Sequence, residues 1–175
     1  MFKKFKKNRI FVSGSILTIL TALVIAAPPG PTIVDVAIQI NSEGDFAGQF
    51  DTLIASLGEA KPLVLETLSG NGQFTVFAPT DDAFAGLGLD PNTVGDLDGQ
   101  FLTDVLLCHV ARGRLYSKSV LSKKRIRVFK GGFLMQDEGI LTDNLGREAD
   151  IIITDVEAAN GVIHAINRVV LPYAP

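Results

Sequence analysis

Hydrophobic periodicity changes near Gly113, and this change restricts the fold of the chain more than any other feature of its sequence. Before Gly113 the apolar residues recur mostly at the three- and four-residue spacing of amphipathic helices, whereas after it they alternate or cluster as in strands. A parallel βαβ array would interleave helices and strands along the chain. We therefore predict an α+β domain in which helices pack beside a mostly antiparallel sheet.

The helical half carries recognisable start signals. Thr32 and Asp35 have the spacing of a capping box, and Pro62 suits the first turn of a helix. Thr80 directly follows an apolar run at 73–79 that is typical of a buried strand, and its hydroxyl can cap the next helix. The predicted helices cover residues 33–40, 46–57, 62–69, 81–87 and 100–112.

The second half reads as a succession of strands separated by turns. Lys130-Gly131-Gly132-Phe133 and Asn160-Gly161 have the composition of hairpin turns. The strand candidates cover residues 113–121, 125–139, 150–161 and 162–172.

The N-terminal segment has the layout of an export signal. Residues 1–9 are basic, residues 10–27 form a run of 18 uncharged residues, and residues 28–31 are a proline-rich spacer before a domain at 32–175. In a helix this run would reach about 27 Å, close to the thickness of the hydrocarbon core of a membrane. We expect one hydrophobic helix here, with the basic end in the cytoplasm and the domain outside.

Two fates of this segment remain open. It can stay as a single membrane anchor, or it can be removed by cleavage near Ala26, which would release a secreted domain. Pro28 would disfavour a cut one residue later. We expect retention, with an extracytoplasmic domain at the periplasmic or cell-surface side.

Charge and cysteine content exclude two common classes of protein. Outside residues 1–9 the chain holds 11 basic and 19 acidic residues, too acidic a balance for a nucleic-acid binder that must neutralise phosphates. Cys108 is the sole cysteine, so no disulfide forms within the chain, and we expect the thiol to be buried.

Three stretches carry a family resemblance. TVFAPTDDAF at 75–84 and GVIHAINRVVLP at 161–172 resemble the paired motifs of the fasciclin domain family, and LLCHV at 106–110 occupies the place of its central helix. The resemblance extends from about residue 32 to residue 172. It implies a twisted β-wedge or sandwich with packed helices and a role in adhesion or protein binding. The motif residues to which we assign structural roles are Thr80, Asp81, Asp82, Phe84, His109 and His164.

The chain departs from the family at one position. Cys108 replaces the tyrosine of a Tyr-His pair, whereas His109 is kept. In animal members of the family that region is associated with integrin binding, and here Arg112-Gly113-Arg114 stands instead of an Arg-Gly-Asp sequence. Integrin binding is therefore not expected, although adhesion in the general sense is.

A basic stretch is the candidate partner-binding patch. It holds eight of the sixteen basic residues on an otherwise acidic domain, which suits another protein, an acidic surface or a polysaccharide. The alternative is a solvated edge strand whose charges discourage pairing with other chains. The eight residues are Arg112, Arg114, Lys118, Lys123, Lys124, Arg125, Arg127 and Lys130.

We expect no enzyme, no metal and no cofactor. The chain contains neither a G-x-S-x-G elbow nor a phosphate-binding glycine motif. The acidic loop with Asp90, Asn92, Asp96 and Asp98 lacks the ligand spacing of an EF-hand.

Two functions compete. The first is a non-catalytic binding or adhesion module tethered to the membrane. The second is an accessory single-pass subunit of a membrane complex, for example an electron-transport or photosynthetic assembly. Small residues such as Ser13, Gly14 and Ser15 favour the second, because they allow close helix packing.

Overall fold

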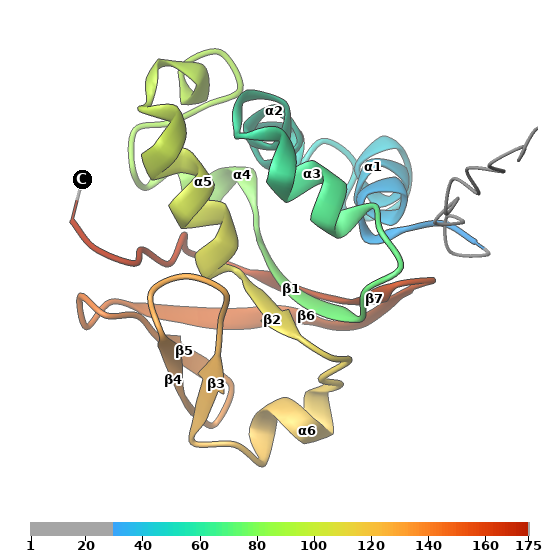
Figure 1. Cartoon of the computed structure of the whole chain (residues 1–175), viewed down its shortest axis with the longest axis vertical. Helices are drawn as coiled ribbons and strands as arrows, with labels where there is room; N and C mark the ends of the chain where they lie inside the picture. Colours follow the sequence, from blue (N-terminus) through green and yellow to red (C-terminus); the bar gives the residue numbers. More distant parts are fainter. Residues whose placement is uncertain (1–29, 175) are drawn as a thin grey trace, which may run out of the picture.

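The computed structural model describes residues 30–174, which form six α-helices, one 3-10 helix and a seven-stranded sheet (Figure 1). The helices are α1 (Ile33–Ser42), α2 (Asp51–Glu59), α3 (Pro62–Leu68), α4 (Asp81–Ala85), η1 (Val94–Asp96), α5 (Gly99–Cys108) and α6 (Ser117–Leu121). The strands are β1 (Phe74–Pro79), β2 (Val110–Arg112), β3 (Arg125–Arg127), β4 (Phe133–Asp137), β5 (Ile140–Thr142), β6 (Glu148–Ala158) and β7 (Gly161–Ile166).

The sheet has the order β2-β1-β7-β6-β5-β4-β3. All neighbouring strands are antiparallel except β1 and β7, which are parallel, so the prediction of a mostly antiparallel α+β domain is confirmed. The sheet curls until its two end strands approach each other. An isolated bridge joins Ala111 to Val128, and the Phe129 N–H donates to the Val110 carbonyl at 2.9 Å.

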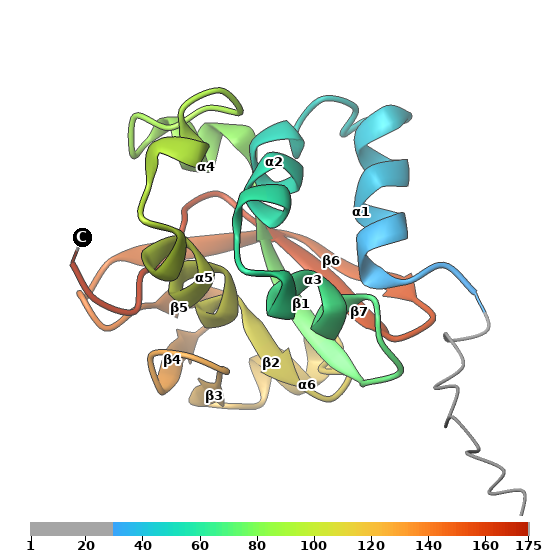
Figure 2. The same ribbon diagram turned by 45° about the horizontal axis from the view of Figure 1, so that its top comes forward.

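Helices α1 to α5 cover one face of the sheet, and α6 lies on the opposite side (Figures 1 and 2). One apolar cluster fills the space between these helices and the sheet, with Phe50, Val64 and Phe84 almost fully buried. A second cluster lies within the curl of the sheet, around Phe77 and Ile126. At about 1.5–3 kcal/mol for each large side chain, burial of these two clusters is the main favourable term in folding.

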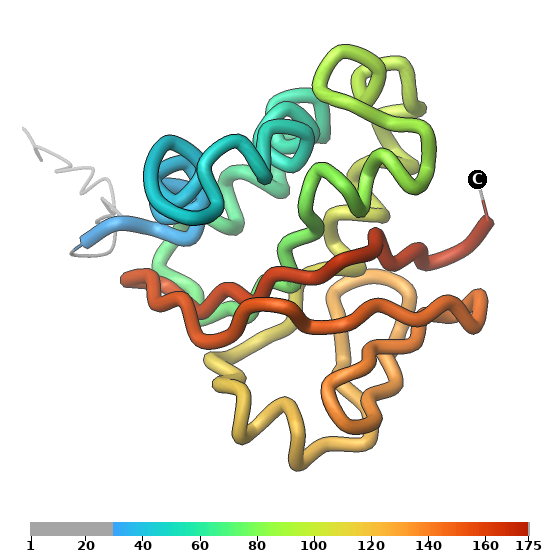
Figure 3. Tube along the Cα trace, turned by 180° about the vertical axis from the view of Figure 1, so that it is seen from behind, coloured from blue at the N-terminus to red at the C-terminus, as the bar shows by residue number. Residues whose placement is uncertain are grey.

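The turn between β6 and β7 connects the sheet to the helices (Figure 3). Asn160 is fully buried: its side-chain oxygen accepts from the Ile33 N–H at 2.8 Å, and its nitrogen donates to the carbonyls of Leu68 and Gly70. A β-carbon at Gly161 would collide with the main-chain oxygen of Phe74 on the neighbouring strand. The predicted hairpin turn is present, with Ala158 and Gly161 as its closing pair.

Four secondary-structure predictions were wrong in type or in bounds, the first three as follows. Residues 113–121 do not form a strand but a loop followed by α6, because the Asp155 carboxylate accepts from both the N–H and the hydroxyl of Ser117 and so caps a helix. The helix predicted over 100–112 ends at Cys108, since Val110 pairs with Val76 in the sheet. The strand predicted over 162–172 ends at Ile166.

The predicted second helix begins later than expected, at Asp51 rather than at residue 46. The Asp81 carboxylate accepts from the N–H groups of Asp51 and Thr52 at 3.2 and 2.8 Å, which fixes this start from a distant part of the chain. Local sequence carries no trace of this contact.

The hydrophobic helix predicted over 10–27 lies outside the described residues. None of the helices within residues 30–174 has the length and apolar character needed to cross a membrane.

Candidate functional site

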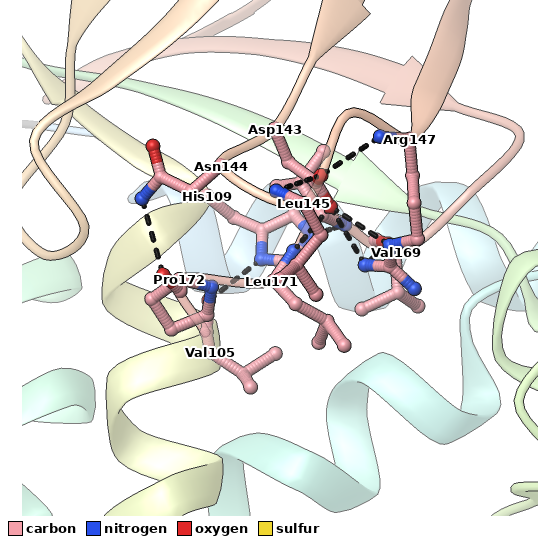
Figure 4. Close-up of polar contacts among 10 residues, drawn as sticks. Val105, His109, Asp143, Asn144, Leu145, Arg147, Val169, Leu171 and Pro172 are labelled. Atoms are coloured by element: carbon pink, nitrogen blue, oxygen red, sulfur yellow. Dashed lines mark hydrogen bonds and ion pairs between the residues drawn. The ribbon is translucent and has the colours of Figure 1, made fainter. Parts of the chain in front are cut away.

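The C-terminal segment is fixed by a buried polar cluster, which we call the anchor: His109, Asp143 and Arg147 with residues 169–172 (Figure 4). His109 follows the last turn of α5 and is only 2% exposed. Its Nδ1–H donates to the Val105 carbonyl at 2.7 Å, so Nε2 is free to accept from the Val170 N–H at 3.1 Å. Burial lowers the pKa of His109 to about 4, although the bond to Val105 opposes the shift. The imidazole is therefore neutral at physiological pH.

Asp143 is the centre of the anchor. Its Oδ2 accepts from Arg147 Nε and Nη2 at 2.9 and 2.8 Å and from the Leu171 N–H at 3.0 Å. Its Oδ1 accepts from the N–H groups of Leu145 and Arg147 at 2.9 and 3.0 Å. Burial alone would raise the pKa of the carboxyl, but these hydrogen bonds outweigh it and hold the pKa below its ordinary value.

The anchor uses its polar groups internally. Arg147 Nη2 donates to the Val169 carbonyl at 2.9 Å, and the Asn144 amide donates to the carbonyls of Gly131 and Pro172. Among residues 30–174, no buried side-chain nitrogen or oxygen lacks a hydrogen-bond partner. The arrangement holds the buried residues 169–172 in place, and its polar groups bond to one another or to nearby main chain.

Cys108 lies in the second apolar cluster, beside the anchor. The thiol is 1% exposed, as predicted, and burial raises its pKa to about 12, with the negative charge of Asp143 adding to the effect. A thiol that stays protonated is a poor nucleophile and a poor metal ligand.

The other motif residues also make structural contacts. The Thr80 hydroxyl accepts from the Ala83 N–H at 3.4 Å, Asp81 caps α2, and Phe84 is 1% exposed. Asp82 is exposed in the first turn of α4, where the helix dipole favours a carboxylate.

His164 is fully buried on β7. Its Nε2–H donates to the Leu115 carbonyl at 2.7 Å, its Nδ1 accepts from the Asp155 N–H at 3.2 Å, and its ring stacks on Phe77. Burial lowers its pKa as well.

Half of the predicted basic patch gathers around a surface groove with a volume of about 460 Å³, which we call the arginine groove. Its floor is aromatic: the Arg112 guanidinium lies 4.9 Å from the centre of the Phe129 ring, and those of Arg125 and Arg127 lie 4.9 and 5.7 Å from the centre of the Phe133 ring. The residues lining the groove are Arg112, Leu115, Lys123, Arg125, Ile126, Arg127, Val128, Phe129 and Phe133.

The remaining four basic residues of the patch are not part of the groove. Lys124 pairs with Asp137 at 2.7 Å, and Lys130 pairs with the buried Asp104 at 2.9 Å. Arg114 donates to the Ala159 carbonyl at 2.6 Å, and Lys118 is exposed on α6. Four residues of the predicted patch therefore line the arginine groove, and the other four lie outside it.

The acidic loop is organised by its own main chain. Asp90 Oδ1 accepts from the N–H groups of Asn92 and Thr93 at 2.7 and 3.0 Å, and these bonds lower the pKa of the carboxyl. Within residues 30–174 no three acidic, histidine or cysteine side chains gather closely enough to hold a metal ion.

The sequence did not indicate the partners of His109 in the anchor or the aromatic rings beneath the arginines of the arginine groove. Asp143 and Arg147 lie in the turn between β5 and β6 with no motif to mark them. Phe129 was expected in a strand and Phe133 in a hairpin turn. The alternation of Arg125 and Arg127 with apolar neighbours was the only local signal of the groove.

Comparisons with known proteins agree with the motifs. The family model of the fasciclin domain matches residues 48–172. The Synechocystis protein sll1483 is 36% identical over 129 residues, covering 70% of this chain and 67% of that protein. Another Synechocystis protein, sll1735, is 33% identical over 145 residues, covering 81% of this chain and 98% of that protein.

Two further matches come from animal proteins. The transforming growth factor-beta-induced protein ig-h3 of Sus scrofa is 31% identical over 90% of this chain but only 22% of its own length. A solved FAS1 domain pair from the insect cell adhesion molecule Fasciclin I matches with a TM-score of 0.62 and 17% identity, covering 81% of this chain and 51% of that one. That structural match shows the fold.

Proposed function

The chain belongs to the fasciclin domain family, and on that premise we propose that it is an extracytoplasmic, non-catalytic protein-binding module whose arginine groove holds an acidic partner. Membership of this family supports a role in adhesion or protein binding. The histidines, the cysteine and the anchor carboxylate, which are the usual candidates for catalysis, are all buried and engaged in packing or hydrogen bonds.

One observation carries the proposal. The four groove cations, Arg112, Lys123, Arg125 and Arg127, are exposed, and no ion pair joins them to a carboxylate of residues 30–174. Three of them lie over aromatic rings, which hold a guanidinium in place while leaving its N–H donors available. Such a preorganised cationic surface on an acidic domain suits an acidic ligand.

A pair of matched variants of the full-length chain tests the groove. Arg125→Gln with Arg127→Gln removes two charges from the groove, and Lys118→Gln with Lys124→Gln removes two charges outside it. With poly-L-glutamate as the probe, the groove variant should bind at least about ten-fold more weakly, and the control should change about two-fold or less. Equal losses in both variants would mean that net charge, not the groove, binds the probe.

We also propose that residues 10–27 remain as a membrane anchor, with residues 1–9 in the cytoplasm. The run of uncharged residues after a basic end supports this topology. Intact mass of the mature protein tests it, because a chain that begins near Ala27 would instead be a secreted binder.

The second candidate, an accessory single-pass subunit of an electron-transport or photosynthetic assembly, rests on the small residues of the same segment. Co-purification with a membrane complex in mild detergent would support it. A mature protein without residues 10–27 would exclude it.

A further inference from the structure

The free edge of the sheet lies in the arginine groove. β3 is the last strand of the sheet and pairs only with β4, through Arg125 with Met135, Ile126 with Leu134 and Arg127 with Phe133. Its other edge faces the space that separates it from β2. Figure 1 shows β3 beside β4, and β2 is the strand at the other end of the sheet order.

The hydrogen-bond pattern tells which main-chain groups point toward this space. The Val128 N–H donates to the Gly132 carbonyl, and the Gln136 N–H donates to the Lys124 carbonyl. In an antiparallel pair the bonded residues alternate with unbonded ones. Residues 124, 126 and 128 therefore bond to β4, whereas the N–H and C=O groups of Arg125 and Arg127 point away from it, toward the groove.

The curl of the sheet closes one end of this edge and leaves the rest open. At the closed end the Phe129 N–H donates to the Val110 carbonyl, and Ala111 bridges to Val128, so the Arg127 carbonyl faces the Arg112 N–H of β2. From that point toward Lys123, the lining residues surround an open cavity in place of a pairing strand. The main-chain groups that face the open cavity are therefore the N–H and C=O of Arg125 and the N–H of Arg127, and the same two residues carry the unpaired guanidinium groups.

We propose that the partner of the groove is an extended acidic peptide of another protein, which adds to the free edge of β3 as a further strand. This inference rests on the proposed function and specifies the class of ligand. The main chain of the peptide would pair with the N–H and C=O groups of Arg125 and with the N–H of Arg127. Carboxylates at alternate positions would lie on the same face as the two guanidinium groups.

The main-chain groups favour a peptide over other polyanions. A polysaccharide sulfate or a lipid headgroup can satisfy a guanidinium, but neither offers donors and acceptors at the spacing of a β-strand. An extended peptide satisfies both sets of groups at once. Charge would steer the peptide to the groove, and strand pairing would fix its register.

The probe is a synthetic peptide in which Glu alternates with Val, tested on the full-length chain. Two isomers carry N-methyl groups either on every Glu amide or on every Val amide, so that charge and methylation are matched. A strand has two edges, and only one set of amides can face β3. We expect one isomer to bind at least about ten-fold more weakly than the unmodified peptide and the other to keep most of its affinity. The identity of the weakened isomer gives the strand direction: Glu for antiparallel, Val for parallel.

Hydrogen exchange provides a second measurement. The unmodified peptide should slow exchange at the amides of Arg125 and Arg127, whereas the amide of Ile126, which already bonds to β4, should change little. Equal binding of all three peptides, or no protection at Arg125 and Arg127, would overturn strand addition.

The same peptides separate failure of this inference from failure of the proposed function. If the groove variant loses the unmodified peptide while methylation has no effect, the groove binds acidic ligands by charge alone and strand addition is wrong. If neither the groove variant nor methylation changes binding, the groove is not the binding site and both proposals are wrong.

Discussion

Arg147 in the anchor donates to Asp143 and to the Val169 carbonyl, whereas Arg125 and Arg127 in the arginine groove lie over Phe133 and pair with no carboxylate of the described residues. The side chain of Asp143 is fully buried, and the two groove arginines are exposed. A buried charge must find its partners within the fold, because leaving it unpaired would cost several kcal/mol. An exposed guanidinium is hydrated and can exchange water for a ligand.

The anchor and the arginine groove therefore use polar residues in two ways, one for stability and one for binding. Groups that are satisfied internally stabilise the fold and offer little to a partner, even when they include a histidine and a carboxylate, which are common catalytic groups. Groups that are held in place but not satisfied are available for binding. Stability and binding should therefore respond to different substitutions.

The largest effect is expected for Asp143→Ala. The substitution removes five hydrogen bonds and leaves Arg147 and the Leu171 N–H without their partner, at a cost of about 3–5 kcal/mol in the free energy of unfolding. Urea denaturation followed by circular dichroism measures it. Asp137→Ala, which breaks the exposed pair with Lys124, is the matched control and should leave the midpoint almost unchanged. Similar losses from both would mean that the anchor is no more important than a surface ion pair.

The second largest effect is expected from acid, which should lower the free energy of unfolding through the buried histidines. The pKa of His109 is about 4 in the folded protein and 6.5 in its ordinary state, so the unfolded chain binds a proton first as the pH falls. The stability that comes from the neutral imidazole is complete above pH 6.5 and declines as the pH falls toward 4. His164, whose pKa is also lowered, acts in the same direction.

Urea midpoints between pH 7.5 and 4.5, with NMR titration of the imidazoles, test this dependence. A constant midpoint over that range, or a His109 that titrates near 6.5 in the folded protein, would contradict the buried neutral histidine.

The smallest effect on stability is expected in the groove. Arg125→Gln with Arg127→Gln should leave the urea midpoint within experimental error, since both side chains are exposed and form no ion pair within residues 30–174. The same variant should lose acidic ligands. A clear drop in stability would show that the cation–π contacts with Phe133 belong to the fold, and the contrast between the two regions would then disappear.

Much of the fold was predictable because its signals are local. The Thr32–Asp35 capping box forms as expected, Thr80 caps its helix, and the apolar run at 73–79 contains β1, which is buried throughout. The order of helices before strands gave the α+β class, and the quoted motifs gave the family. Each of these features depends on residues close together in the chain.

The errors occurred where distant contacts decide the local structure. Residues 113–121 have the composition of a strand, but Asp155 caps Ser117 and α6 forms. The second helix begins at Asp51 because Asp81 accepts from its first N–H groups. Hydrophobic periodicity carries no information on these contacts, because the residues that make them are about thirty to forty positions apart in the sequence.

The candidate site likewise has one feature set by the sequence and one set by distant contacts. The sequence by itself determined that a basic stretch at 112–130 stands out from an acidic domain, since charge is a property of composition. Only the tertiary structure decided which of those cations share a groove: the curl of the sheet brings Arg112 of β2 near Arg125 and Arg127 of β3, while Lys130 pairs with Asp104. The physical reason is that a charge becomes a binding group or a structural one according to the partners within its reach, and the fold alone sets those distances.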